Sequence, residues 1–181
     1  GDGNQQYLAT EGSFSHFVDD PYLEETISRE PLFDDSDVIV IGGGFGGMLA
    51  AARLQEVGVE KIRIIEKGGD FGGTWYWNRY PGAMCDIESY IYLPLLEEMN
   101  YVPKEKYTRA PEILAYSRRI AEHYGLYEHA CLQTQVTEVR WDETSARWIV
   151  STDRGDRMTA RFVAMSNGPL SKPKLPGIAG I

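Results

Sequence analysis

Glycines and one carboxylate are spaced in the sequence as a dinucleotide site requires. Gly42, Gly44 and Gly47 form a GxGxxG pattern, and Glu66 follows at about the spacing of an acid that binds a ribose. The first glycine permits a tight turn, the second lets backbone approach a pyrophosphate, and the third lets a helix pack close to a strand. The pattern alone also fits a glycine-rich turn without a ligand. Because the Glu66 carboxylate would repel a 2′-phosphate, we expect FAD or NAD and not NADP at this site.

A second group of glycines, followed by aromatic residues, lies in the stretch EKGGDFGGTWYWNRYPGAMCD, which begins at Glu66. Gly72 and Gly73 would let backbone approach a ligand again, close to the predicted ribose acid. Trp75 and Trp77 offer flat apolar walls of the kind that a flavin ring needs. The alternative is that these two rings simply fill the core.

The elements that must position these residues follow from the pattern of apolar residues. The run DVIVI, which begins at Asp37, predicts a strand buried on both faces. The segment GGMLAAARLQEVG contains good helix formers and ends at Gly58, where a left-handed residue is favoured. The segment KIRIIE over residues 61–66 predicts a second strand. A strand, glycine turn, helix and strand within about thirty residues form a βαβ unit.

The pattern further along the chain predicts one helix and then several strands. The segment APEILAYSRRIAEHYG predicts a helix over residues 110–125. Alternating segments at 132–141, 146–153 and 157–165 predict an antiparallel meander that feeds a final strand. The predicted fold class is therefore α/β, with a Rossmann-like parallel sheet and an antiparallel β-meander.

The first 35 residues differ from the rest of the chain. Residues 1–35 are polar and acidic with scattered aromatic residues, and they show no sustained helical or strand period. They fit either a partly disordered tail or an arm whose aromatic residues dock on the domain. We predict an N-terminal extension at 1–35 and one dinucleotide-binding domain at 36–181.

Composition limits the classes of partner. The 181 residues carry a formal net charge of −9, which argues against binding to nucleic acid or to an anionic membrane. The longest uncharged stretch, residues 38–52, is too short and too rich in glycine to span a bilayer. Cys85 and Cys131 lie in unrelated contexts, so we expect no metal site and no disulfide framework. This cysteine usage favours a reducing, cytoplasmic location.

Three stretches together resemble the FAD-binding domain of type I Baeyer–Villiger monooxygenases, which are single-component, FAD-containing enzymes. They are GGGFGG from Gly42, EKGGDFGGTWYWNRYPGAMCDIESYIY from Glu66, and SNGPLSKPKLPGIAG from Ser166. The resemblance covers nearly everything from Asp37 to the C-terminus, and the middle stretch is much more specific than a dinucleotide fingerprint. It implies a flavoprotein fold that binds two dinucleotides.

The resemblance implies roles for residues along the whole cofactor. The implied pyrophosphate turn consists of Gly42, Gly44, Gly46 and Gly47, and the implied ribose acid is Glu66. Further implied cofactor contacts are Gly73, Thr74, Trp75, Trp77, Asp86, Tyr92 and Val136, the last through its backbone at the adenine.

Asp86 has a second implied role, in catalysis. It matches an active-site aspartate beside the flavin that is thought to position an arginine. Judged from the residues alone, Asp86 also fits a helix cap or a surface carboxylate, because CDIES could begin a helix. Met84 stands where some family members carry arginine.

The resemblance also implies the activity and partners of a complete enzyme. Family members use FAD, NADPH and O2 to convert ketones to esters or lactones. Their FxGxxxHxxxW signature, second GxGxxG and catalytic arginine are absent from these residues. We therefore expect a first segment that ends before the NADPH domain and depends on the remainder of the same enzyme. Two alternatives stay open: the FAD segment of an N- or S-oxidising flavoprotein monooxygenase, and a non-catalytic FAD-binding module.

Overall fold

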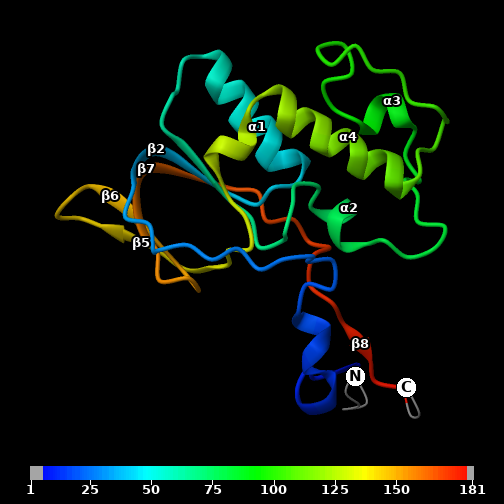
Figure 1. Ribbon diagram of the computed structural model, residues 1–181, viewed down its shortest axis with the longest axis horizontal. Coiled ribbons are helices and arrows are strands. Elements are labelled where there is room, and N and C mark those ends of the chain that lie inside the picture. Colours follow the sequence, from blue (N-terminus) through cyan, green and yellow to red (C-terminus); the bar gives the residue numbers. More distant parts are fainter. Residues whose placement is uncertain (1–5, 179–181) are drawn as a thin grey trace.

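The computed structural model describes residues 6–178 and has a mixed six-stranded sheet at its centre (Figure 1). Its strands, in chain order, are β2 (Asp35–Ile41), β3 (Ile62–Ile65), β4 (Ala130–Cys131), β5 (Val136–Asp142), β6 (Arg147–Thr152) and β7 (Arg157–Met165). The spatial order is β4-β3-β2-β7-β6-β5. Pairing is parallel from β4 to β7 and antiparallel from β7 to β5. The predicted fold class, a parallel sheet with an antiparallel meander, is confirmed.

Two helices lie on one face of the parallel part of the sheet (Figure 1). They are α1 (Phe45–Glu56), which connects β2 to β3, and α4 (Ala110–His123). Val38 and Val40 of β2 pack in the hydrophobic cluster that contains these helices. Ile39 and Ile41, which alternate with them, pack on the other face with residues of β6 and β7. The strand is thus buried on both faces, as its continuous apolar run predicts.

Two short elements were not predicted, α2 (Thr74–Trp77) and the 3-10 helix η2 (Leu126–His129). A third, α3 (Ser89–Tyr92), begins at the serine of CDIES, the stretch that could begin a helix. The predicted start of the meander is wrong, because Ala130–Cys131 pairs with β3 as β4, and β5 begins only at Val136. The chain crosses from one edge of the sheet to the other between them, and Thr134 N donates to Glu66 O at 2.9 Å in this crossing. Residues 132–135, between β4 and β5, therefore form a loop that lies at the end of β3.

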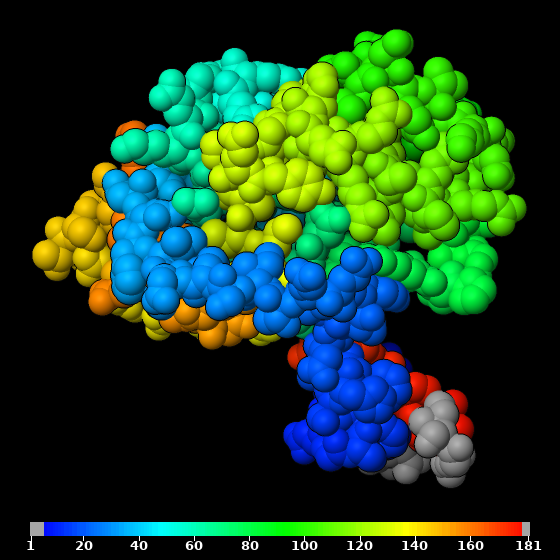
Figure 2. All heavy atoms as spheres, viewed as in Figure 1, coloured from blue at the N-terminus to red at the C-terminus, as the bar shows by residue number. Residues whose placement is uncertain are grey.

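The N-terminal residues form an arm on the domain and a small unit apart from it. Residues 19–34 run along the domain toward β2 (Figure 2), and Tyr22 packs edge-on against Tyr76 with ring centroids 5.9 Å apart. The preceding 3-10 helix η1 (Gly12–Val18) and strand β1 (Tyr7–Leu8) lie away from the sheet, where β1 pairs with β8 (Leu175–Pro176) (Figure 1). Residues 1–35 were interpreted either as a partly disordered tail or as an arm that docks on the domain. Residues 19–34 form such an arm, in which Tyr22 is the aromatic residue that contacts the domain. Residues 1–5 lie outside the described part of the chain.

A membrane span and a metal cluster were not expected. Among residues 6–178, no helix has the length and apolar character needed to cross a bilayer. Within the same residues, no group of three or more His, Cys, Asp or Glu side chains is placed to hold a metal ion.

Candidate cofactor-binding site

A cavity of about 370 Å³ opens at the carboxyl ends of β2, β3 and β7. Ligands of open α/β sheets bind in the crevice outside the carboxyl ends of their strands. Four segments supply the walls: the turn from β2 into α1, the residues from β3 to α2, the approach to β5, and the residues after β7. The lining residues used below are Gly42, Gly44, Phe45, Gly46, Glu66, Lys67, Gly73, Thr74, Trp75, Trp77, Tyr92, Thr134, Val136, Ser166, Asn167 and Gly168.

Backbone contacts at the first turn account for two of the glycines. Gly42 has a φ of +110°, and a Cβ there would lie 2.3 Å from Ser166 O. The residues after β7 approach this closely because Ser166 N donates to Ile41 O at 2.8 Å. A Cβ on Gly47 would lie 1.8 Å from Gly42 O. The two glycines therefore let α1 and the exit of β7 meet at the floor of the cavity.

The second glycine turn lies directly against the first. A Cβ on Gly73 would lie 2.7 Å from Gly44 Cα, and Gly72 N donates to Gly43 O at 3.0 Å. Gly44 precedes α1, and no side chain among the described residues caps this helix. The first N–H groups of a helix have no intrahelical partner and lie at the positive end of the helix dipole. This bare backbone is suited to an anionic group such as a pyrophosphate.

Glu66 is held in place by backbone amides at the end of β3. The residue is 6% exposed, its Oε1 accepts from Gly68 N at 2.6 Å, and its Oε2 accepts from Gly43 N at 2.6 Å. Burial raises the pKa of Glu66, although the two amide donors favour the ionised form. Two carboxylate oxygens can accept about four hydrogen bonds. Glu66 therefore retains acceptor sites for ribose hydroxyls in the cavity that it lines.

Aromatic side chains form a wall at the α2 side of the cavity. Trp75 Nε1 donates to the Tyr92 hydroxyl at 2.8 Å, and the Tyr92 ring meets the Phe45 ring edge-on with centroids 5.8 Å apart. Trp77 also lines the cavity, and Lys67 Nζ is 5.2 Å from its ring centroid. The expectation that both tryptophans lie near a flavin stays a prediction.

Most of the predicted contacts come together in this one cavity. All of those named from the sequence line it except Gly47 and Asp86. Gly47 lies outside the cavity and packs against the backbone of Gly42, which agrees with the predicted role of the third glycine in helix packing. Asp86 is exposed and does not cap α3, which begins three residues later at Ser89. Burial raises the pKa of Tyr92, the Trp75 hydrogen bond lowers it, and the charges of Cys85 and Asp86 raise it to a smaller extent.

Several lining residues were not predicted. Ser166, Asn167 and Gly168 follow β7, and Thr134 precedes β5. A signal for the first group exists in the sequence, because the buried run FVAM ends in small and polar residues. Placing them at the cavity, however, requires the parallel register of β7 with β2, in which Met165 is opposite Ile41.

The protein-family model for "pyridine nucleotide-disulphide oxidoreductase" matches residues 39–181. Among curated relatives, pentalenolactone D synthase from Streptomyces arenae is 57% identical over 97% of this chain and 30% of its own length. A Baeyer–Villiger monooxygenase from Streptomyces coelicolor is 52% identical over 99% of this chain and 30% of its own length. The chain thus spans about 30% of the length of the curated relatives that it matches.

Solved structures of monooxygenases match the fold. The polycyclic ketone monooxygenase of the fungus Thermothelomyces thermophila aligns with a TM-score of 0.87 and 35% identity, over 97% of this chain and 31% of its own. A crystal structure of OTEMO in complex with FAD and NADP aligns with a TM-score of 0.74 and 38% identity, over 81% of this chain and 28% of its own.

These matches confirm the resemblance to Baeyer–Villiger monooxygenases that the glycine and tryptophan stretches indicate. The matching family model covers the turn from β2 into α1, Glu66, the aromatic wall and the residues after β7. The chain therefore belongs to the pyridine nucleotide-disulphide oxidoreductase family.

Proposed function

We propose that this chain is the FAD-binding segment of a Baeyer–Villiger monooxygenase that uses NADPH and O2 to convert ketones to esters or lactones. The observation that carries the proposal is the cavity in which the glycine turns, Glu66 and the aromatic wall come together. The names of the relatives and their identity to this chain support the same activity.

The residues of the cavity fit FAD along its length. The contact between Gly44 and Gly73 leaves bare backbone and the start of α1 for the pyrophosphate. Glu66 would accept hydrogen bonds from the ribose hydroxyls, and Val136 would contact the adenine. Thr74, Trp75 and Tyr92 would face the flavin part. When bound, FAD would supply the redox and oxygen-activating chemistry, while the residues of this chain hold and orient it and exclude water.

Asp86 remains the proposed catalytic residue of this segment. Its carboxylate is exposed, and it would be accessible to orient a cation from the remainder of the same enzyme. The NADPH site would also lie mostly in that remainder. In the complete enzyme, Asp86→Asn is expected to lower ketone turnover without lowering the FAD content, whereas the exposed control Glu97→Gln should change neither.

The test is product analysis on the complete natural polypeptide. We expect a yellow protein that consumes NADPH and O2 and releases an ester or lactone from a ketone. Release of only a hydroxylamine or sulfoxide would instead assign the segment to an N- or S-oxidising monooxygenase. Bound FAD without any substrate-dependent NADPH consumption would identify a non-catalytic FAD-binding module.

We also propose a cytoplasmic location and no nucleic-acid or membrane partner. The free, buried thiols of Cys85 and Cys131 support a reducing compartment, and the net charge of −9 disfavours polyanions. Cell fractionation that recovered the protein in a secreted or membrane fraction would contradict this proposal.

A further inference from the structure

The arm of residues 19–34 lies along the outer side of two loops that also face the cavity. These are residues 66–69, which carry Glu66 and Lys67, and residues 133–136, which carry Thr134 and Val136. The space-filling view shows the arm as a blue band across the domain, with the yellow residues near 130 beside it (Figure 2). Neither Asp20 nor Arg29 of the arm lines the cavity itself.

Asp20 holds the first loop. Its Oδ2 accepts from Gly69 N at 3.0 Å and from the Tyr76 hydroxyl at 2.7 Å. Its Oδ1 accepts from Tyr22 N at 3.0 Å, and the Tyr22 hydroxyl reaches Trp77 O at 3.4 Å. One carboxylate of the arm therefore fixes the backbone just after the ribose acid and the helix that carries the aromatic wall.

Arg29 and its neighbours hold the second loop. The Arg29 guanidinium donates to both oxygens of Asp156, at 2.6 and 2.7 Å, and to Thr134 Oγ1 at 3.2 Å. Gln133 is also fixed from the arm, because Ile27 N donates to its Oε1 at 2.9 Å. A bidentate pair of this kind fixes direction as well as distance.

The two loops are joined to each other as well as to the arm. Gln133 N donates to Gly68 O, and Thr134 N donates to Glu66 O, both at 2.9 Å. The loops and the arm therefore form one hydrogen-bonded unit behind the ribose and adenine end of the cavity. Movement of either arm contact would be transmitted to both loops.

We propose that Asp20 and Arg29 are positioning residues for the adenosine part of the bound cofactor. The arm keeps the loops at 66–69 and 133–136 at the separation that this part of the ligand needs. The inference rests on the proposed FAD site, and it assigns a role to the N-terminal arm.

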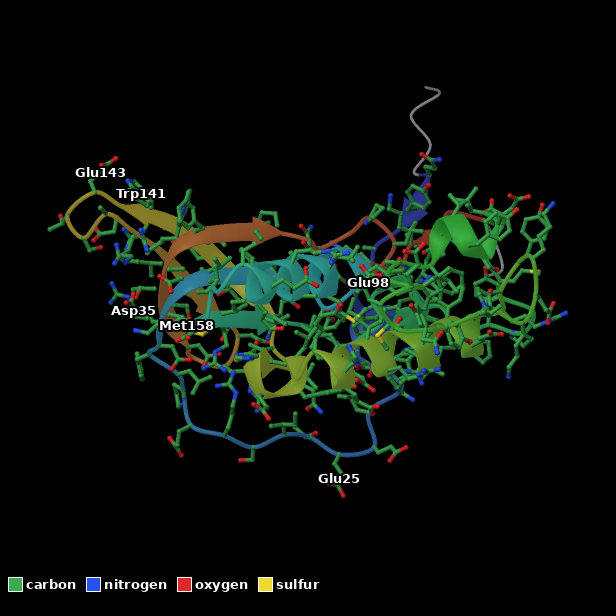
Figure 3. All side chains as sticks on the ribbon, turned by 90° about the horizontal axis from the view of Figure 1, so that it is seen from above. Glu25, Asp35, Glu98, Trp141, Glu143 and Met158 are labelled. Carbon is green, nitrogen blue, oxygen red and sulfur yellow. The ribbon has the colours of Figure 1, made fainter. Side chains whose placement is uncertain are left out.

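Hydrogen exchange on the cofactor-free protein tests the coupling. Asp20→Ala is expected to speed exchange at residues 133–136, which Asp20 does not touch, and Arg29→Ala is expected to speed it at residues 66–69. The matched control is Glu25→Ala, which also removes one carboxylate from the arm; Glu25 points away from the domain (Figure 3). Faster exchange confined to the arm and the directly contacted loop would overturn the inference.

FAD retention by the complete holoenzyme gives an independent readout. Asp20→Ala and Arg29→Ala are expected to raise the FAD dissociation rate about tenfold each, since both remove hydrogen bonds to a charged group. Arg29→Lys should recover only part of this loss, because a lysine cannot make the bidentate pair. The kcat and the KM for ketone at saturating FAD should match those of Glu25→Ala.

The failure of the inference is distinguishable from failure of the proposed function. If the natural protein retains FAD and the arm variants release it no faster than Glu25→Ala, the positioning role is wrong. If the natural protein itself binds no FAD, the proposed function is wrong, and the exchange experiment alone decides whether the arm couples the loops.

Discussion

Gly46 and Gly47 are adjacent in the sequence, but the space around them differs. A Cβ on Gly47 would lie 1.8 Å from Gly42 O, whereas a Cβ on Gly46 would lie 3.7 Å from its nearest neighbour, Ser166. The first position cannot accept a side chain without moving the helix away from the strand turn. The second can, so the packing of the fold does not require this glycine, and close approach of the proposed cofactor would explain it.

Substitution by alanine is expected to change the stability differently at Gly46 and at Gly47. Gly47→Ala is expected to lower the free energy of unfolding by about 1–3 kcal/mol, as overpacking does. Gly46→Ala should leave it unchanged or raise it by up to about 1 kcal/mol, because alanine is the better helix former. The same Gly46→Ala variant should nevertheless bind FAD more weakly. Urea denaturation and FAD titration measure both quantities, and equal stability losses in the two variants would contradict the assignment.

Glu66 predicts a pH-dependent affinity. Burial raises the pKa of Glu66 in the folded protein above the ordinary value of 4.5. At a pH between 4.5 and the raised pKa, the folded protein therefore binds more protons than the unfolded chain. Its contribution to stability therefore falls as the pH rises through this window. If Glu66 binds the ribose as proposed, the ribose hydroxyls would donate to the ionised carboxylate, so the affinity for ADP should rise as the pH rises through the raised pKa.

The measurement is an ADP titration of the cofactor-free protein at a series of pH values from 4.5 upward. Glu66→Gln should bind more weakly at the upper end, and its affinity should lose most of the pH dependence. An unchanged pH profile in the glutamine variant would show that another group causes it.

Helices and strands with a pattern in their own residues were predicted from the sequence, whereas those that depend on pairing with a distant strand were not. β2, α1 and β3 were predicted because their apolar runs and glycine turn lie within one βαβ unit. β4 has only two residues and exists because it pairs with β3. Likewise, Glu66 was identified from spacing, but Ser166 reaches the site only through the register of β7 with β2. Long-range pairing of this kind leaves no local pattern to read.

The attachment of the arm to the meander predicts an acid-sensitive contribution to stability. Burial alone would raise the pKa of Asp156, but Arg29, Thr152 and Leu32 N lower it from 3.8 to about 2. A carboxylate with a lowered pKa stabilises the fold above its unfolded value and loses that contribution as the pH falls toward the folded value. A difference of nearly two units corresponds to about 2 kcal/mol.

Urea denaturation of the natural protein and of Arg29→Ala at decreasing pH tests this account. Near neutral pH the variant should be less stable by about 2 kcal/mol or more, because it leaves a buried carboxylate without its partner. The difference should shrink as the pH falls from about 4 toward about 2. A difference that stays constant down to the lowest pH would show that Asp156 is not the group involved.

For the molecule as a whole, the cavity connects segments that are far apart in the sequence. The turn after β2, the stretch from Glu66 to Trp77, the approach to β5 and the residues after β7 all contribute walls. The walls come together only when the sheet is formed, so the unfolded chain has no binding site. A ligand of this cavity must therefore stabilise the fold by mass action.

This linkage predicts which ligands stabilise the protein. In the proposed site, the amide-held Glu66 would bind a ribose and the bare backbone at Gly44 would bind a pyrophosphate, and both groups are present in FAD and in ADP. At a hundredfold excess over Kd, each ligand is expected to stabilise the fold by about 2.7 kcal/mol, which raises the Tm by roughly 5 to 10 °C. FMN, which has a flavin but no adenosine, should give a much smaller shift at the same concentration.

Thermal unfolding followed by tryptophan fluorescence or calorimetry measures these shifts. If FMN stabilised the protein as well as ADP did, the aromatic wall and not the ribose end would dominate binding, and the assignment of Glu66 would be wrong.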